Sequence, residues 1–184
     1  MSELPTPNAL QIDLLRALRD HSMIACQAGW GSGKTTALSM ALITYAAANP
    51  NGASLFVTDT NKRYISVVYP SLVEWTQRLW AQPWEYSASE QRWTAPNGHT
   101  IWCRSYFRPN TKTANQNSLE GINCGMALID EAQVLTEEVA HKALGRIRSA
   151  GEMGSRLVIC GLPVHAAWWV DMAERTGGAV IKHT

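Results

Sequence analysis

Residues 28–35 read Ala-Gly-Trp-Gly-Ser-Gly-Lys-Thr, the pattern of a phosphate-binding loop. The apolar run at 22–26 predicts a short buried strand before the loop, and the Ala- and Leu-rich segment at 33–48 predicts a helix after it. In this setting the glycines let successive backbone N–H groups point at one anion, and the helix N-terminus adds a positive field. The loop therefore predicts a site for the phosphates of ATP.

The side chains of the loop have separate expected roles. Lys34 is placed to reach the β- and γ-phosphates, and the Thr35 hydroxyl is placed to hold Mg²⁺. Position 28, where the motif usually has Gly, is Ala, and a small residue still fits there. The loop residues expected to bind ATP are Gly29, Trp30, Gly31, Ser32, Gly33, Lys34, Thr35 and Thr36.

Gln11 is a further candidate for nucleotide binding. It lies near the start of a predicted helix that follows a Pro-containing entry, away from the face that carries the leucines. Its amide can donate to and accept from the two edge groups of adenine at once. An ordinary surface position is the alternative interpretation.

A second motif, Met-Ala-Leu-Ile-Asp-Glu at 126–131, is an apolar strand that ends in two carboxylates. Asp130 is expected to hold Mg²⁺ through its water shell, and Glu131 to orient and polarise the attacking water. Alone, such a strand is common in buried sheets. Together with the phosphate-binding loop it predicts Mg²⁺-dependent ATP hydrolysis, with Glu131 and Lys34 as the catalytic residues.

Composition limits what these motifs can belong to. A chain of 184 residues with 46% apolar content can bury one core, so one domain over 1–184 is expected. The net charge of +1 gives no overall attraction to nucleic acid or membrane. The four cysteines lie far apart and indicate reduced core thiols, and the scattered histidines indicate no structural metal. With no apolar run of about eighteen residues, the chain is expected to be soluble and cytosolic.

The remaining pattern predicts an α/β fold of the RecA-like (ASCE) P-loop NTPase class, in which helices flank a mostly parallel sheet. Residues 93–95 and 99–106 predict an inserted β-hairpin around Asn97 and Gly98. Residues 64–80 predict one helix that Pro70 must kink or split, with Ile65 and Leu79 among the inward residues. The other predicted strands are 53–58, 126–129, 156–160 and 179–182.

Three further segments allow functional interpretations. The polar stretch 107–118 could lie on a nucleic-acid backbone or be a solvated loop. A helix capped by Thr136 is expected to bury Leu144 and to carry Arg146 and Arg148 in its last turn. There the two cations suit the helix dipole or serve as an arginine finger. The turn Gly161-Leu162-Pro163 is expected beside the γ-phosphate, where it can couple hydrolysis to movement.

With these parts in place, the chain resembles the N-terminal ATPase domain of the large terminase subunit of tailed bacteriophages. The resemblance rests on the order and spacing of the Pro-rich entry with Gln11, the loop at 28–35, the hairpin, the segment 118–121, the acidic strand and the turn at 161–163. It implies a motor that packages double-stranded DNA in the host cell cytoplasm. The implied partners are a homo-oligomeric ring on a portal, and a small terminase subunit is a further candidate partner.

Two departures from the family leave the source of an arginine finger open. Similar terminases often have Arg inside the loop, where this chain has Trp30, and in a Leu-Arg-Gly element, where this chain has Glu120. The candidates are Arg63, Arg104, Arg146 and Arg148. A full terminase also has a nuclease domain after this one. The acids that follow Glu131 end no apolar strand, so this chain is expected not to cut DNA and to be a fragment or a stand-alone ATPase.

Two other functions fit parts of the sequence. The string Asp-Glu-Ala-Gln at 130–133 also suits the N-terminal RecA-like half of a superfamily 1 or 2 helicase, which would need a second such domain. A slow nucleotide-gated switch that orders an assembly is the other alternative. The missing arginines favour the switch, whereas the intact Glu131 disfavours it.

Overall fold

The computed structural model describes residues 6–106, 119–149 and 151–183. Within these residues the strands form one sheet in the order β3-β4-β5-β2-β6-β7-β1-β8. From β5 to β8 all neighbours are parallel, whereas β3 and β4 are added antiparallel. The strands are β1 Met23–Ala28, β2 Ala53–Thr58, β3 Glu85–Ser87, β4 Arg92–Thr94, β5 Thr100–Ser105, β6 Met126–Ile129, β7 Arg156–Gly161 and β8 Ala179–His183.

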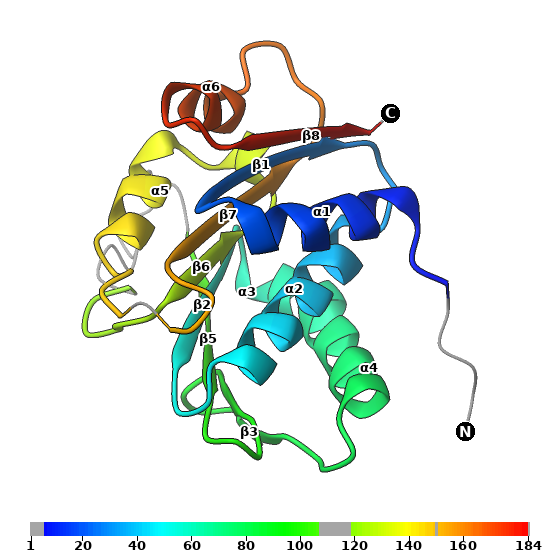
Figure 1. Cartoon of the computed structure of the whole chain (residues 1–184), viewed down its shortest axis with the longest axis vertical. Helices are drawn as coiled ribbons and strands as arrows, with labels where there is room; N and C mark the ends of the chain where they lie inside the picture. The colour runs from blue at the N-terminus through cyan, green and yellow to red at the C-terminus, as the bar shows by residue number, and fades with distance from the viewer. Residues whose placement is uncertain (1–5, 107–118, 150, 184) are drawn as a thin grey trace.

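Helices cover both faces of the sheet (Figure 1). The elements α1, α2 and α4 pack on one face, and α5 and α6 on the other. The α-helices are α1 Ala9–Asp20, α2 Lys34–Ala48, α3 Asn61–Arg63, α4 Tyr69–Leu79, α5 Glu137–Leu144 and α6 Trp168–Arg175, with a π-helix at Tyr64–Val68 and a 3-10 turn at Ala132–Val134. None of the described helices is long and apolar enough to cross a membrane. The predicted mostly parallel sheet with flanking helices is confirmed.

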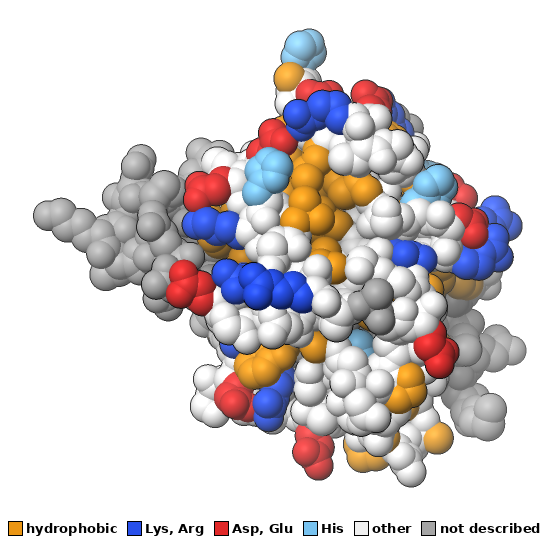
Figure 2. Space-filling view, turned by 60° about the vertical axis from the view of Figure 1, so that its left-hand side comes forward, with side chains coloured by type: hydrophobic (Ala, Val, Ile, Leu, Met, Phe, Trp, Pro, Cys, Tyr) orange, Lys and Arg blue, Asp and Glu red, His pale blue; other side chains and the backbone are white. Residues whose placement is uncertain are grey.

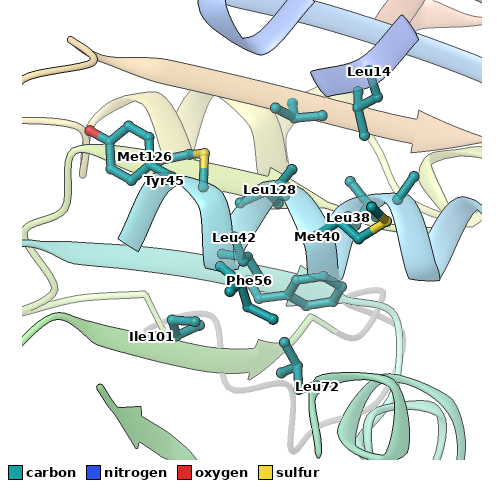
Figure 3. Close-up of a cluster of buried hydrophobic side chains, with 14 of the residues drawn as sticks. Leu14, Leu38, Met40, Leu42, Tyr45, Phe56, Leu72, Ile101, Met126 and Leu128 are labelled. Atoms are coloured by element: carbon teal, nitrogen blue, oxygen red, sulfur yellow. The ribbon is translucent and has the colours of Figure 1, made fainter. Parts of the chain in front are cut away.

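The central strands are buried on both faces because successive side chains point to opposite sides. In β1, Ile24 and Cys26 belong to the cluster under α1 and α2, whereas Met23 and Ala25 belong to the cluster under α6. Figure 3 shows the first cluster, in which side chains of α2 lie between those of the sheet and of its neighbouring helices. The prediction that α2 is buried on nearly every side is confirmed.

The predicted hairpin is confirmed and is part of the main sheet. Strands β4 and β5 pair antiparallel, with Trp93 opposite Ile101, and Gly98 has a φ of 83° in the turn. The same β5 pairs in parallel with β2 along its whole length. The short strand β3, which the sequence pattern did not indicate, adds to the outer side of β4.

The predicted helix at 64–80 is divided into a π-helix and α4. Pro70 lies in the first turn of α4, where its missing N–H is tolerated. The wider π turn shifts the helical register, so Tyr64 faces the core and its hydroxyl accepts a hydrogen bond from Trp93 at 3.2 Å. The prediction that Ile65 and Leu79 point inward is wrong, since they are 58% and 41% exposed.

The helix expected to carry Arg146 and Arg148 ends earlier. It stops at Leu144, and the chain then pairs with Cys124, whose N–H donates to the Arg146 carbonyl at 2.9 Å. The prediction that both arginines lie in the last helical turn is therefore wrong. The prediction that Leu144 is buried is also wrong. Leu144 lines a cavity of about 290 Å³ with Met23 and Met172. Figure 2, turned toward the α5 side, shows apolar side chains exposed on this face.

Candidate nucleotide-binding site

The phosphate-binding loop lies between the last residue of β1 and the first residue of α2. Gly31 and Gly33 have φ angles of 72° and 83°, which glycine adopts without strain. A Cβ on Gly33 would come within 3.0 Å of the Gln11 amide nitrogen, so this position is also sterically restricted. Ala28, at the position where the motif usually has Gly, is the buried last residue of β1, and its strand conformation accommodates a small side chain.

Lys34 is held inside the loop. Its ammonium is almost fully buried and donates to the carbonyl oxygens of Ala28 at 2.8 Å and Gly29 at 2.7 Å. These two carbonyls satisfy a charge that would otherwise be costly to bury. A cation is thus placed beside the N-terminus of α2, where both attract an anion.

Thr35 and Asp130 meet although they lie on different elements. The Thr35 hydroxyl donates to the Asp130 carboxylate at 3.3 Å, because β1 and β6 end at the same edge of the parallel sheet. Asp130 is fully buried, and its other oxygen accepts the Glu131 backbone N–H at 3.0 Å. A hydroxyl beside a buried carboxylate is the kind of oxygen donor set that Mg²⁺ prefers, so these residues fit that ion.

The surroundings of Asp130 alter its proton affinity. Burial raises the pKa of its carboxyl to about 6, and the charge of Glu131 acts in the same direction. The Arg63 guanidinium and hydrogen bonds from the Glu131 backbone and the Thr35 hydroxyl lower that pKa. A cation bound at this point would favour the ionised carboxylate still more strongly.

Glu131 has an unusual backbone conformation and both of its carboxylate oxygens are engaged. Its φ of 59° is left-handed, which costs about 1 kcal/mol or more for a non-glycine residue. One oxygen forms an ion pair with Arg63, and the other accepts a hydrogen bond from the Gln133 amide. The side chain is almost fully buried. The strained turn therefore holds a charged carboxylate next to Asp130.

Arg63 is the predicted arginine that the structure brings to the acidic residues. It follows β2, the neighbour of β6, and its guanidinium also lies 3.8 Å from the Asp130 carboxylate. The other three candidates lie elsewhere. Arg104 donates to the Glu90 and Cys103 carbonyls and lies over the Trp102 ring, Arg148 donates to the Gly145 carbonyl, and Arg146 follows α5.

Gln11 lies against the loop and is buried, so the surface interpretation is wrong. Its side-chain oxygen accepts the Asn8 backbone N–H at 3.0 Å, while the Asn8 side chain accepts the Gln11 N–H at 3.0 Å. The Asn8 amide also donates to the Ser32 carbonyl of the loop at 3.0 Å. The capping box thus connects α1 to the loop. Adenine recognition by Gln11 stays a prediction.

The remaining loop and turn residues differ in exposure: Trp30 and Pro163 are exposed, Leu162 is half-buried and Gly161 is buried. Trp30 is 79% exposed at the tip of the loop. Gly161 and Leu162 lie at the end of β7, and the Leu162 N–H donates to the Gln133 side chain at 3.0 Å. Gln133 was not among the predicted site residues, although its position two residues after Glu131 is a signal in the sequence that could have indicated it. The polar stretch 107–118 lies outside the described residues.

The order of the strands, with β7 between the loop-bearing β1 and the acidic β6, defines a RecA-like P-loop ATPase fold. The family model described as terminase large subunit, T4likevirus-type, N-terminal, matches residues 25–166. The chain therefore belongs to this terminase family. No similar sequence was found among curated proteins.

Solved large terminases share the fold at low sequence identity. The large terminase of a thermophilic bacteriophage is 17% identical with a TM-score of 0.76, over 97% of this chain and 46% of that one. The ATPase domain of the Thermus phage P74-26 large terminase is 14% identical with a TM-score of 0.70, over 97% and 81%. The HK97 large terminase is 15% identical with a TM-score of 0.70, over 100% and 40%. This chain thus spans under half of the first and third proteins, and the predicted fold class and family are confirmed.

Proposed function

We propose that this chain is the ATP-hydrolysing domain of a phage large terminase, a motor that moves double-stranded DNA into a procapsid. The observation that carries the proposal is the meeting of the Thr35 hydroxyl and the Asp130 carboxylate at 3.3 Å, beside Lys34 and Glu131. Family membership supports the packaging role. The large terminase of the thermophilic bacteriophage has been solved with ADP and with ATP-gamma-S, which supports a nucleotide as the ligand.

ATP would bind first to the phosphate-binding loop. Backbone N–H groups of residues 29–36 take the phosphate oxygens, and Lys34 exchanges the Ala28 and Gly29 carbonyls for the β- and γ-phosphates. Thr35 and Asp130 would hold Mg²⁺, which would supply positive charge to neutralise the phosphates. Gln11 is the proposed adenine contact, and Trp30 flanks the phosphates from the exposed side.

Hydrolysis would depend on Glu131. Its carboxylate orients the attacking water and takes the proton that the water loses. The buried site and the ion pair with Arg63 of the same chain keep the carboxylate in place. Residues Gly161, Leu162 and Pro163 are proposed to couple hydrolysis to movement, which is supported by the hydrogen bond from the Leu162 N–H to the Gln133 side chain.

The motor role implies partners that remain proposals. They are double-stranded DNA, other copies of the chain in a ring on a portal, and a small terminase subunit, all in the host cytoplasm. Arg104, Arg146 and Arg148 stay candidates for a finger that a neighbouring subunit inserts. Residues 1–184 are proposed to form one ATPase domain without nuclease activity.

Steady-state ATP hydrolysis with and without duplex DNA tests this proposal. Lys34→Ala and Glu131→Gln should each lower turnover by about a hundredfold or more. Glu131→Gln should still bind ATP because it leaves the loop intact, and DNA should raise the wild-type rate. Glu74→Gln, which changes an exposed glutamate of α4, is the matched control and should hydrolyse ATP normally.

Other outcomes would favour the alternatives. Wild-type protein that binds ATP but turns over no faster than Glu131→Gln would contradict the motor proposal and favour a nucleotide-gated switch. A monomer that prefers single-stranded DNA would favour the helicase half. A ring seen by native mass spectrometry or small-angle scattering would support the motor.

A further inference from the structure

Gln133 lies between the catalytic carboxylate and the turn that follows β7. Its amide nitrogen donates to Glu131, and its amide oxygen accepts the Leu162 backbone N–H at 3.0 Å. One side chain thus contacts both groups, using a donor for the first and an acceptor for the second. A carboxylate or an alkyl group at position 133 could not make both bonds.

The segment after β7 is attached to the same turn at a second point. The Trp168 indole N–H donates to the carbonyls of Ala132 at 3.1 Å and Leu135 at 3.2 Å. The two ends of the segment 162–168 are therefore both fixed to residues 132–135, which directly follow Glu131. Movement of this segment must move the Glu131 turn or break these bonds.

The chain is closely packed at Gly161, directly before the segment 162–168. A Cβ on Gly161 would come within 2.6 Å of the Trp169 ring and 3.0 Å of the Gln133 side-chain oxygen. The Trp169 indole is itself anchored to the Cys26 carbonyl of β1 at 3.2 Å. Gly161 is thus enclosed between a fixed ring and the Gln133 amide.

The Glu131 carboxylate is held at both of its oxygens. Arg63 holds one oxygen and Gln133 holds the other. Of these two partners, Gln133 is the one that also contacts Leu162. A shift of the turn after β7 would move the Gln133 amide and so change the orientation of the carboxylate toward the attacking water.

We propose that Gln133 is a positioning residue that transmits movement between the turn at 161–163 and the catalytic carboxylate of Glu131. This inference rests on the proposed ATPase function. Coupling would run in both directions, because the same two hydrogen bonds connect the groups. Displacement of the turn would change the geometry of Glu131, and a change at Glu131 would alter the Leu162 amide.

The test combines ATPase kinetics with hydrogen exchange at the Leu162 amide, using Gln133→Met, which keeps the length of the side chain and removes both bonds. We expect kcat to fall about tenfold to a hundredfold because the carboxylate is misplaced, with KM for ATP changed little. In the wild type, ATP-gamma-S should alter exchange at Leu162. In the variant this response should be lost.

Two further variants separate coupling from folding. Gln133→Glu keeps an acceptor for Leu162 but loses the donor to Glu131, so Leu162 should stay protected without responding to nucleotide. Gln27→Met is the matched control, since Gln27 contacts the same segment 162–168 at the Val164 carbonyl and is not one of the proposed catalytic residues, and it should behave as wild type. Thermal unfolding of each variant verifies that it is folded.

The outcomes for the two proposals can be told apart. Wild-type kinetics and a wild-type Leu162 response in a folded Gln133→Met would overturn the role of Gln133 while leaving the ATPase proposal intact. If wild-type protein does not hydrolyse ATP, the ATPase proposal fails. Hydrogen exchange at Leu162 then decides alone whether Gln133 transmits movement. Loss of the Leu162 response in Gln133→Met then supports transmission, and its persistence overturns it.

Discussion

Asp130 shows how a single buried side chain makes stability depend on pH. Its folded-state pKa of about 6 lies above the ordinary value of 3.8. Between these two values the native protein binds more protons than the unfolded chain does, so stability falls as the pH rises. The contribution of Asp130 is greatest below about pH 4 and is lost as the pH passes 6.

Asp130→Asn should therefore remove part of the pH dependence of stability. In urea unfolding with EDTA, raising the pH from about 4.5 to about 7.5 should destabilise the wild type more than the variant, by at most on the order of 3 kcal/mol. Asp171→Asn, at an exposed aspartate, should follow the wild type. Equal pH slopes for wild type and Asp130→Asn would contradict the prediction.

At the residue scale, the sequence predicted the groups whose chemistry belongs to a motif. Lys34, Thr35, Asp130 and Glu131 could be found because each lies at a fixed offset from a strand end. The contacts of Glu131 could not be found in this way. They depend on a left-handed φ at this residue and on the path of the chain after β2 and β7, neither of which leaves a local pattern.

At the element scale, α1 does more than cover the sheet. Its N-terminal capping box satisfies the first turn of the helix, and the Asn8 amide extends the same network to the Ser32 carbonyl. The conformation of the loop is thus partly set by a helix that precedes it. Stability of α1 and nucleotide affinity should be connected through this side chain.

Two substitutions at Asn8 should separate these effects. Asn8→Ala loses the cap and should cost about 1 kcal/mol in the free energy of unfolding, together with weaker nucleotide binding. Asn8→Ser keeps a capping oxygen but has no amide to reach Ser32, so it should regain most of the stability and not the affinity. Chemical denaturation measures the free energy of unfolding, and titration with a fluorescent nucleotide measures the affinity. Parallel recovery of both would show that Ser32 is not involved.

The limits of elements were harder to predict than their presence. Proline and periodicity indicated a break near Pro70. The π turn at Tyr64–Val68 closes its hydrogen bonds over one residue more than an α-helix does, and packing of Tyr64 stabilises it. Similarly, the helix after Thr136 ends where the chain pairs with Cys124, a partner distant in sequence. Tertiary contacts therefore decided both deviations.

At the scale of the whole molecule, stability comes from a sheet that is buried on both faces. The two clusters lie on opposite faces of the same strands, whose side chains alternate between them. Fold class and topology could be predicted because alternation of apolar strands and helices is a property of the whole chain. Which leucines belong to the core could be predicted only where the helical register was regular.

Leu128→Ala and Leu79→Ala should differ strongly for this reason. Leu128 is fully buried in β6, and its truncation should lower the free energy of unfolding by about 3 kcal/mol. Leu79 is 41% exposed, so its truncation should cost less than about 1 kcal/mol. Urea denaturation measures the free energy of unfolding of both variants. Equal losses would restore the inward orientation that periodicity indicated for Leu79.

The central position of β7 has a mechanical consequence. It is hydrogen-bonded to β6 on one side and to β1 on the other, in parallel ladders. A pull on the chain beyond Gly161 along the strand would stress β7 in shear, so that the hydrogen bonds of both ladders resist together. The edge strand β8 is held by one ladder, to β1. A force applied at Gly161 would thus be resisted by two ladders, whereas the same force applied to β8 would be resisted by one.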